Sequence, residues 1–140
     1  MKTEIINNLI DGQSIAFIAS VDEAGYPNQK AMLAPRKREG LKKFYLTTNT
    51  SSMRVRQYQN NSKASIYFCD SRKFQGVMLI GEMEVLTDQK SKDMIWQEGD
   101  EIYYTKGKTD PDYCVLCFTT KSARYYEGFK SESFDFYEQI

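Results

Sequence analysis

The sequence predicts a mainly antiparallel β-barrel with peripheral helices, and three features of the chain support this. Five or six short runs rich in apolar residues follow one another, separated by turns that contain glycine, proline or aspartate. Helical patterns are short and do not alternate regularly with strands, as they would in a parallel sheet. At 140 residues the chain fits one domain, residues 1–140, which is long enough to bury its own core.

The first part of the chain predicts a helix followed by a hairpin. Apolar residues one turn apart indicate a short amphipathic helix at residues 3–10, with Gly12 as its C-cap. Residues 14–21 are rich in Ile, Phe and Val and predict a strand, and the glycine and proline that follow suit a hairpin turn. The returning strand is expected at residues 28–34.

The next part predicts a turn, a strand and a helix. Residues 35–40 are charged and end in glycine, which is typical of a turn, and residues 43–48 alternate as a half-buried strand does. Ser51 or Ser52 can then cap a short helix that ends near Asn60.

Two strands of a second hairpin are expected at residues 63–69 and 76–87, joined by a turn at residues 70–75. Gly81 stands in the middle of the longer strand, which indicates a bend or bulge where the barrel curves.

The last part predicts a helix, a long loop and further strands. Asp88 caps a helix to about Gln97, and a polar loop covers residues 98–112. Residues 113–119 form a strong strand and residues 124–127 a weaker one. The aromatic tail from Ser131 onward is expected to pair as an edge strand.

Charge and residue types exclude several classes of function. Lys plus Arg number 19 and so do Asp plus Glu, so no overall field draws the protein to nucleic acid or to an anionic membrane. The chain has no histidine, which removes Ser-His-Asp and Cys-His nucleophiles, His-ligated zinc and histidine acid–base catalysis.

The three cysteines and the N-terminal residues indicate a cytoplasmic protein. An odd number of cysteines without a secretion signal argues against a disulfide framework. No stretch approaches the length of a membrane span, so we expect no membrane partner.

Residues 47–54 are the strongest candidate for a binding site. They combine hydroxyl groups, a predicted helix N-terminus and a cation one turn into the helix, which is the chemistry that a phosphate monoester requires. In the alternative, a serine only caps the helix and the arginine is solvated; the residues alone support both interpretations equally. The residues concerned are Thr47, Thr48, Ser51, Ser52 and Arg54.

Other motifs have structural explanations. Cys114 and Cys117 are three apart on a predicted strand and so point to opposite faces, which favours core cysteines over a metal pair. Asp110 and Asp112 flank a proline without calcium-loop spacing, so we interpret them as a turn. The chain has neither a Rossmann glycine motif nor a P-loop. Trp96 is interpreted as a core residue, with a lid over a flat cofactor as the alternative.

Several motifs, in their order and spacing, resemble the pyridoxamine 5′-phosphate oxidase-like flavin-binding split barrels, in particular the general stress protein 26 branch. The similarity covers residues 15–126. It is carried by Phe-Tyr-Leu-Thr-Thr-Asn at 44–49, Ser-Ser-Met-Arg-Val-Arg-Gln at 51–57, Ala-Ser-Ile-Tyr-Phe-Cys-Asp at 64–70, residues 76–87 and Asp-Pro-Asp-Tyr at 110–113.

The resemblance implies a homodimer with flavin mononucleotide (FMN) at the subunit interface. The phosphate would be bound by Thr48, Ser52 and Arg54, with Lys30 on a preceding strand. The backbone of Ala31, Met32 and Leu33 would meet the polar edge of the isoalloxazine ring. Gln75 and Trp96 would come from the other subunit.

The chain also departs from the family pattern. Met53 stands where members often have Arg or Lys, and Pro35 lies near a position at which some members carry a further lysine, which implies a weakened phosphate site. Pyridoxamine-phosphate oxidases bind substrate with a C-terminal Arg and His pair that this chain lacks, so that activity is not expected.

The leading hypothesis is therefore an FMN-dependent oxidoreductase that moves electrons or hydride between the flavin and an unidentified small molecule. No catalytic residue and no metal ligand can be named. The alternative is a non-enzymatic flavin binder that acts as a stress sensor or store; haem is less favoured because no histidine can be an axial ligand. A deazaflavin enzyme would need more basic residues around its anionic tail.

Overall fold

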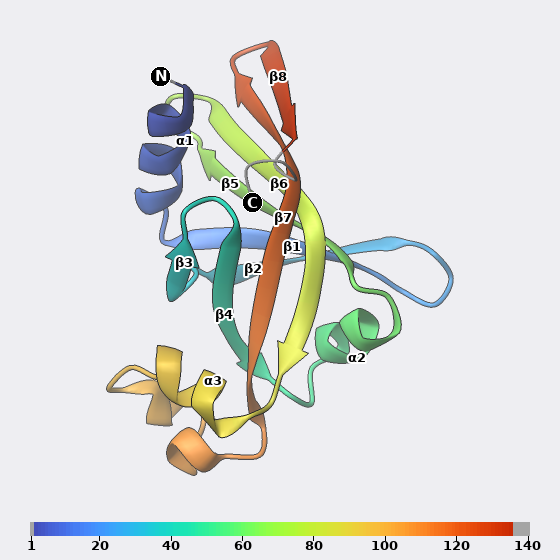
Figure 1. Cartoon of the computed structure of the whole chain (residues 1–140), viewed down its shortest axis with the longest axis vertical. Coiled ribbons are helices and arrows are strands. Elements are labelled where there is room, and N and C mark those ends of the chain that lie inside the picture. The colour runs from blue at the N-terminus through green and yellow to red at the C-terminus, as the bar shows by residue number, and fades with distance from the viewer. Residues whose placement is uncertain (1, 136–140) are drawn as a thin grey trace.

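The computed structural model describes residues 2–135 and shows an eight-stranded antiparallel sheet that curls into an open barrel (Figure 1). The strand order is β2-β1-β5-β6-β7-β4-β3, and β8 also pairs with β7. The predicted fold class, a mainly β split barrel with peripheral helices, is confirmed. The strands are β1 (Ile15–Val21), β2 (Pro27–Leu33), β3 (Lys37–Glu39), β4 (Lys43–Asn49), β5 (Lys63–Asp70), β6 (Gln75–Leu86), β7 (Tyr113–Glu127) and β8 (Lys130–Asp135).

Three α-helices lie at the periphery, all where the sequence predicts helices. The first helix is amphipathic, and the other two are capped by Ser52 and Asp88, whose side chains accept from backbone N–H groups that a helix N-terminus leaves unpaired. Two short 3-10 helices lie in the long loop. The helices are α1 (Lys2–Asp11), α2 (Met53–Asn60), α3 (Gln89–Ile95), η1 (Asp100–Ile102) and η2 (Gly107–Thr109).

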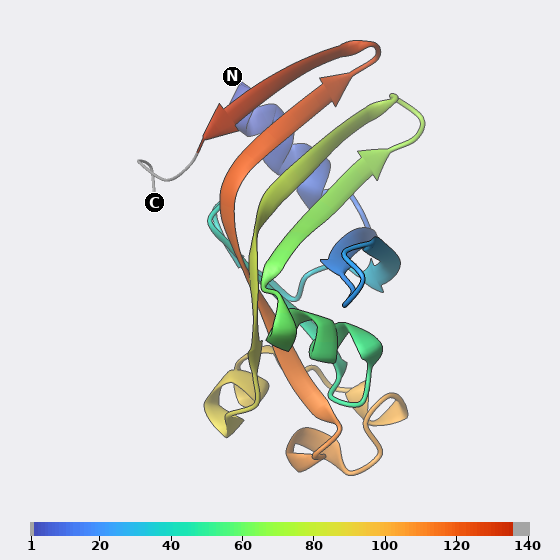
Figure 2. The same ribbon diagram turned by 90° about the vertical axis from the view of Figure 1, so that its right-hand side faces the viewer.

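The long strands β6 and β7 pair along almost their whole lengths and form the spine of the molecule. One half of β7 also pairs with β4 and the other half with β8, so the two hairpins β5–β6 and β7–β8 project at one end (Figure 2). The helices α2 and α3 lie toward the opposite end (Figure 1). This separation decides which predicted site residues can meet within one chain.

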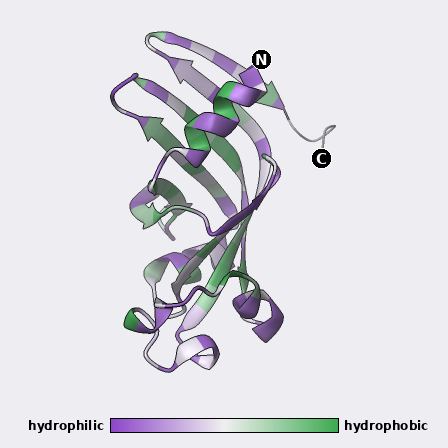
Figure 3. Ribbon diagram, turned by 90° about the vertical axis from the view of Figure 1, so that its left-hand side faces the viewer, coloured by the Kyte–Doolittle hydropathy of each residue, from purple (hydrophilic) through white to green (hydrophobic). Residues whose placement is uncertain are grey.

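Two apolar clusters lie on opposite sides of the sheet. The larger lies inside the barrel, where α1 packs Ile6, Leu9 and Ile10 onto the sheet; Figure 3 shows hydrophobic residues alternating with hydrophilic ones along this helix. The smaller joins Tyr45 and Tyr113 of the sheet to α3 and the loop that follows. Burial of these side chains is the main driving force for the fold.

A bulge bends β6 at the position that the sequence indicated. The register between β6 and β7 shifts between Ile80 and Gly81. A side chain at Gly81 would collide with the backbone carbonyl of Thr119 and meet the ring of Phe118. Only glycine fits this bend, because the neighbouring strand approaches the Gly81 Cα too closely for any Cβ.

The structure differs from the sequence prediction at three places. The predicted turn at 35–40 contains β3, whose register is held by Arg36 N–H on the Tyr45 carbonyl. The two strands expected at 113–119 and 124–127 are one strand, because β7 follows the bend of β6 instead of ending. The long loop is ordered by two 3-10 helices. The tail does pair as an edge strand, β8, as far as Asp135; the rest of the tail lies outside the described residues.

Within residues 2–135, no helix is long and apolar enough to cross a membrane. The same residues contain no group of three or more Cys, Asp or Glu side chains placed to hold a metal ion.

Candidate functional site

The open seam of the barrel lies between the free edges of β2 and β4. In the described part of the chain, β2 pairs only with β1, and beyond Tyr45 the strand β4 pairs only with β7. Lys30 stands opposite the core residue Ile18, so its side chain is on the inward side, yet it is exposed. Thr48 continues the inward-facing series of β4 and is buried. A hydroxyl and a cation therefore face the seam.

The segment 47–54 carries the chain from β4 into the capped helix α2. Ser52 is the N-cap, and its hydroxyl oxygen accepts a hydrogen bond from the Val55 backbone N–H at 3.4 Å. One turn into the helix, the Arg54 guanidinium donates to the Thr48 hydroxyl at 3.3 Å. The structure thus brings together Thr48, Ser52 and Arg54 at one helix N-terminus, as expected for an anion site.

Arg54 is incompletely satisfied. Its Nε is buried and has no hydrogen-bond partner among residues 2–135. Burial lowers the pKa of the Arg54 guanidinium, and no carboxylate offsets that effect. A half-buried cation with a free donor is stabilised by any anion that reaches it.

Thr47 and Ser51, the other predicted residues of this segment, are directed elsewhere. Thr47 lies on the opposite face of β4 from Thr48, where a hydrogen bond from its side chain partly offsets the rise in the Tyr104 pKa that burial causes. The Ser51 backbone N–H donates to the Asp112 carboxylate at 2.8 Å. Both residues therefore contact the long loop, Thr47 through Tyr104 and Ser51 through Asp112.

The β2 residues that were predicted to meet a flavin ring lie on both faces of the strand. Met32 points inward and packs against the larger apolar cluster. Ala31 and Leu33 are exposed on the outer face, and Leu33 pairs with Ile15, which is also exposed. The free backbone edge of β2 remains available to a ligand.

Gln75 and Trp96 lie away from Arg54 within one chain. Gln75 begins β6 in the β5–β6 hairpin, at the end of the sheet opposite α2 (Figure 1). Trp96 packs at ring-centroid distances of 6.2 Å from Tyr104 and 5.3 Å from Tyr113. Trp96 is half-buried and packs against the smaller apolar cluster of its own chain.

The outer face of β1, β2, β5 and β6 is apolar and exposed. Its centre is a shallow hollow beside Phe17, Tyr67 and Met78, and Phe17 keeps 43% of its surface exposed. At Gly76 the end of the Tyr67 side chain occupies the place that a Cβ would take. Contiguous exposed apolar surface of this kind marks an interaction site.

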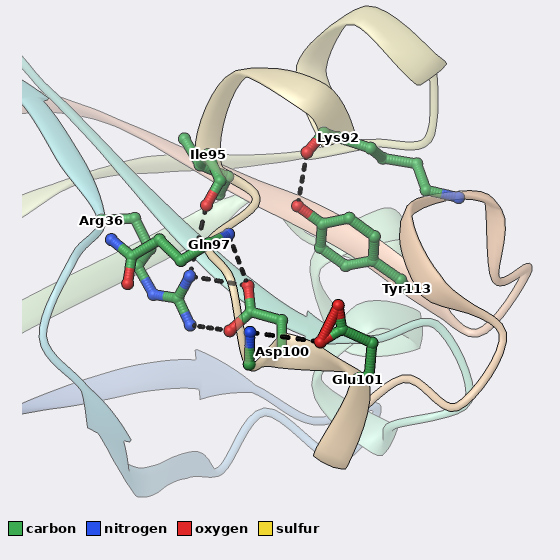
Figure 4. Close-up of polar contacts among 8 residues, drawn as sticks. Arg36, Lys92, Ile95, Gln97, Asp100, Glu101 and Tyr113 are labelled. Atoms are coloured by element: carbon green, nitrogen blue, oxygen red, sulfur yellow. Dashed lines mark hydrogen bonds and ion pairs between the residues drawn. The ribbon is translucent and has the colours of Figure 1, made fainter.

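Contacts of the long loop 98–112 were missed by sequence reasoning. Arg36 forms a bidentate pair with Asp100 at 2.8 Å for both hydrogen bonds and also donates to the Ile95 carbonyl (Figure 4). Asp100 accepts a further bond from the Gln97 N–H, and Arg36 holds the pKa of Asp100 below its ordinary value. No spacing rule connects residues 64 positions apart, so the sequence carried no signal for this pair.

The titratable groups near the site are poorly suited to proton transfer near pH 7. Burial raises the pKa values of Tyr58 and Tyr104, so both hydroxyls stay protonated. Burial also raises the pKa values of the Cys114 and Cys117 thiols, and both cysteines are free and buried, as predicted for core residues.

Comparisons with known proteins agree with this fold. A crystal structure of a Clostridium acetobutylicum protein related to general stress protein 26 is 43% identical, with a TM-score of 0.89 over 99% of this chain and 96% of that one. The Bacillus anthracis general stress protein 26 is 17% identical, with a TM-score of 0.78 over 96% and 98%. A Nostoc punctiforme protein described as pyridoxamine 5′-phosphate oxidase-related and FMN binding is 13% identical, with a TM-score of 0.74 over 94% and 86%.

A comparison with curated proteins found no match. The family model described as pyridoxamine 5′-phosphate oxidase, however, matches residues 3–127, which include all eleven predicted site residues. The chain therefore belongs to the pyridoxamine 5′-phosphate oxidase family, as a relative of the general stress protein 26 group.

Proposed function

We propose that this protein is a cytoplasmic homodimer that binds FMN and moves electrons or hydride between the flavin and a small molecule. Bound FMN would supply the redox chemistry. The chain's own residues would bind the phosphate, orient the ring and exclude water.

The observation that carries the proposal is the unsatisfied Arg54 beside the capped start of α2. A phosphate oxygen would give the buried Nε its missing acceptor, while the Thr48 and Ser52 hydroxyls lie on the same segment. Each hydrogen bond to a charged group contributes about 1.5–3 kcal/mol, and micromolar binding needs about 8 kcal/mol in total. Three such contacts together with burial of the ring are sufficient.

Lys30 supports the same site from across the seam. It is inward-facing but exposed, and α2 is joined to its strand by the Gln57 amide, which donates to Asn28 at 3.4 Å. Asn28 and Lys30 are two residues apart and therefore lie on the same face of β2. Lys30 would thus supply a second positive charge to the phosphate, in part replacing the cation that Met53 does not provide.

The exposed apolar face supports a homodimer. A second copy that covered Phe17, Leu33 and Met78 would remove this surface from water, which stabilises association in proportion to the apolar area buried. By family resemblance, Gln75 and Trp96 of the partner would then reach the flavin, and the β2 edge at 31–33 would meet the polar rim of the ring.

A second candidate is a flavin-binding protein without turnover, such as a sensor or store. The observation that favours it is the set of tyrosines whose pKa values are raised by burial, together with the absence of histidine. The tyrosines are not proton donors tuned to neutral pH, and the chain has no histidine to take that role.

Purified protein tests the proposal through its absorbance spectrum and the mass of the ligand it releases. We expect a flavin spectrum, either as purified or after titration with FMN. A protein that stays colourless and takes up no FMN would refute flavin binding. If FMN binds, anaerobic mixing with NADH and NADPH separates the two candidates: bleaching of the flavin supports an oxidoreductase, and an unchanged spectrum with both supports the sensor.

A further inference from the structure

Asp112 ties the long loop to the proposed phosphate segment through three hydrogen bonds. Its carboxylate accepts from the Ser51 backbone N–H at 2.8 Å and from the Asn49 side-chain amide at 3.0 Å. Its backbone carbonyl accepts from the Thr50 N–H at 2.9 Å. Three successive residues are thus held by one.

These three residues form the link between Thr48 and the first turn of α2. The Ser52 N–H closes the turn by donating to the Asn49 carbonyl at 3.0 Å. Thr48 precedes this turn, Ser52 ends it and Arg54 follows it. The distance from the Thr48 hydroxyl to the helix N-terminus therefore depends on the conformation that Asp112 fixes.

Asp112 is itself well anchored. Its N–H donates to the Asp110 carboxylate at 2.9 Å, and the buried Lys92 ammonium donates to the Asp110 carbonyl at 3.0 Å. The next residue, Tyr113, pairs with Asn49 in the sheet, and its hydroxyl donates to the Lys92 carbonyl at 2.7 Å. The hydrogen bond from the Ser51 backbone N–H is the largest of the effects that hold the pKa of Asp112 below its ordinary value. The Asp112 carboxylate is therefore ionised at neutral pH.

We propose that Asp112 is a positioning residue, which holds the turn at 49–52 so that Thr48, Ser52 and Arg54 converge on a phosphate monoester. The inference rests on the proposed FMN site and adds a residue outside it. A site that is preorganised in this way loses less conformational entropy on binding.

The sign of the effect separates positioning from simple electrostatics. Asp112 is negatively charged and so is a phosphate, so removal of the charge alone would strengthen FMN binding. Removal of a positioning contact would weaken it. Asp112→Asn has nearly the same shape, loses the charge, and cannot accept from both Ser51 and Asn49 as the carboxylate does.

The test compares dissociation constants for FMN and for riboflavin, which lacks the phosphate. For D112N we expect FMN to bind about tenfold more weakly than to the wild type, the loss expected when the displaced turn removes one charge-assisted hydrogen bond to the phosphate, with riboflavin changed less than about twofold. A merely structural role would weaken both ligands alike. If D112N does not fold, Asn49→Ala removes the partner amide instead, with an expected loss in FMN affinity of about threefold.

Asp100→Asn is the matched control. It breaks the pair with Arg36 at the other end of the same loop and touches no residue of the turn 49–52. We expect lower thermal stability and an unchanged ratio of FMN to riboflavin affinity. An equal fall in the ratio of FMN to riboflavin affinity in D100N and D112N would overturn the assignment, because general loosening of the loop would then explain both.

The two proposals fail in different ways. A wild-type protein that binds no FMN refutes the phosphate site, and the role of Asp112 falls with it. A wild-type protein that binds FMN, with equal or tighter binding by D112N, overturns the role of Asp112 alone.

Discussion

Arg54 and Arg56 occupy the same short helix but have different surroundings. Arg54 is partly buried, bonded to Thr48, and has a free Nε, whereas Arg56 is exposed to solvent. The sequence could not separate a solvated arginine from a ligand-binding one, because burial depends on where α2 docks. The pair therefore forms an internal comparison.

We predict that Arg54→Ala weakens FMN binding by at least about tenfold, since a charge-assisted hydrogen bond contributes about 1.5–3 kcal/mol. Arg56→Ala should remain within about twofold of the wild type. Quenching of flavin fluorescence on titration measures both. Equal effects of the two substitutions would place the phosphate elsewhere.

A second comparison at the residue scale concerns two glycines of β6. Gly81→Ala would force a methyl group against the backbone of Thr119, which cannot move without breaking the ladder. We expect a loss of about 1–3 kcal/mol in the free energy of unfolding, the cost of overpacking. Gly76→Ala meets only the end of the Tyr67 side chain, which can rotate away, so its loss should be smaller. Urea denaturation followed by circular dichroism distinguishes the two, and a larger loss for Gly76 would contradict the bulge geometry.

At the scale of elements, the parts that the sequence predicted are those with local signals. Ser52 and Asp88 cap their helices through side-chain bonds to the third residue that follows, and Gly81 marks the bulge. The strand β3 was missed because its charged residues resemble a turn, and only pairing with β4 makes it a strand. The hydrogen bonds of Asp112 to residues 49–51 and the Arg36–Asp100 pair were missed because both connect segments that are distant in the sequence.

Three aspartates of the long loop are expected to make the stability of the folded protein depend on pH. The pKa values of Asp100, Asp110 and Asp112 are all held below the ordinary value of 3.8. The unfolded chain then binds more protons in acid than the folded one, so stability is complete above the ordinary pKa and falls as pH drops below it.

We therefore predict that the melting temperature is nearly constant from about pH 7 to pH 5 and falls between about pH 5 and pH 3. Asp100→Asn should lower the melting temperature at pH 7 and flatten this fall, because one of the groups that titrate is removed. Differential scanning fluorimetry across this range measures both curves. An undiminished slope in the variant would show that Asp100 does not contribute to the acid transition.

At the scale of the whole molecule, the sheet has apolar residues on both faces, and part of the outer face is exposed to solvent. The outer side of β1, β2, β5 and β6 exposes Phe17, Leu33 and Ile80, while the inner side forms the core. Strand alternation in the sequence showed that two faces exist, but it could not show that α1 covers the inner face and leaves the outer one open. The proposed dimer accounts for this surface.

We predict that Phe17→Lys converts the proposed dimer to a monomer and weakens FMN binding, because a charge would then be buried at the interface and the partner's residues would be lost. Ile102→Lys is the control, since Ile102 is 78% exposed on the long loop, away from this face. Light scattering after size-exclusion chromatography gives the mass of each. A wild-type monomer, or a dimer that persists in the Phe17 variant, would contradict the interface.

The central claim is that segment 47–54 recognises a phosphate monoester. The most direct measurement is the ratio of the dissociation constants of riboflavin and FMN for the wild-type protein at one ionic strength. Because three hydrogen bonds to the phosphate are proposed, we predict that FMN binds at least about a hundredfold more tightly than riboflavin. Equal affinities for FMN and riboflavin would contradict the account.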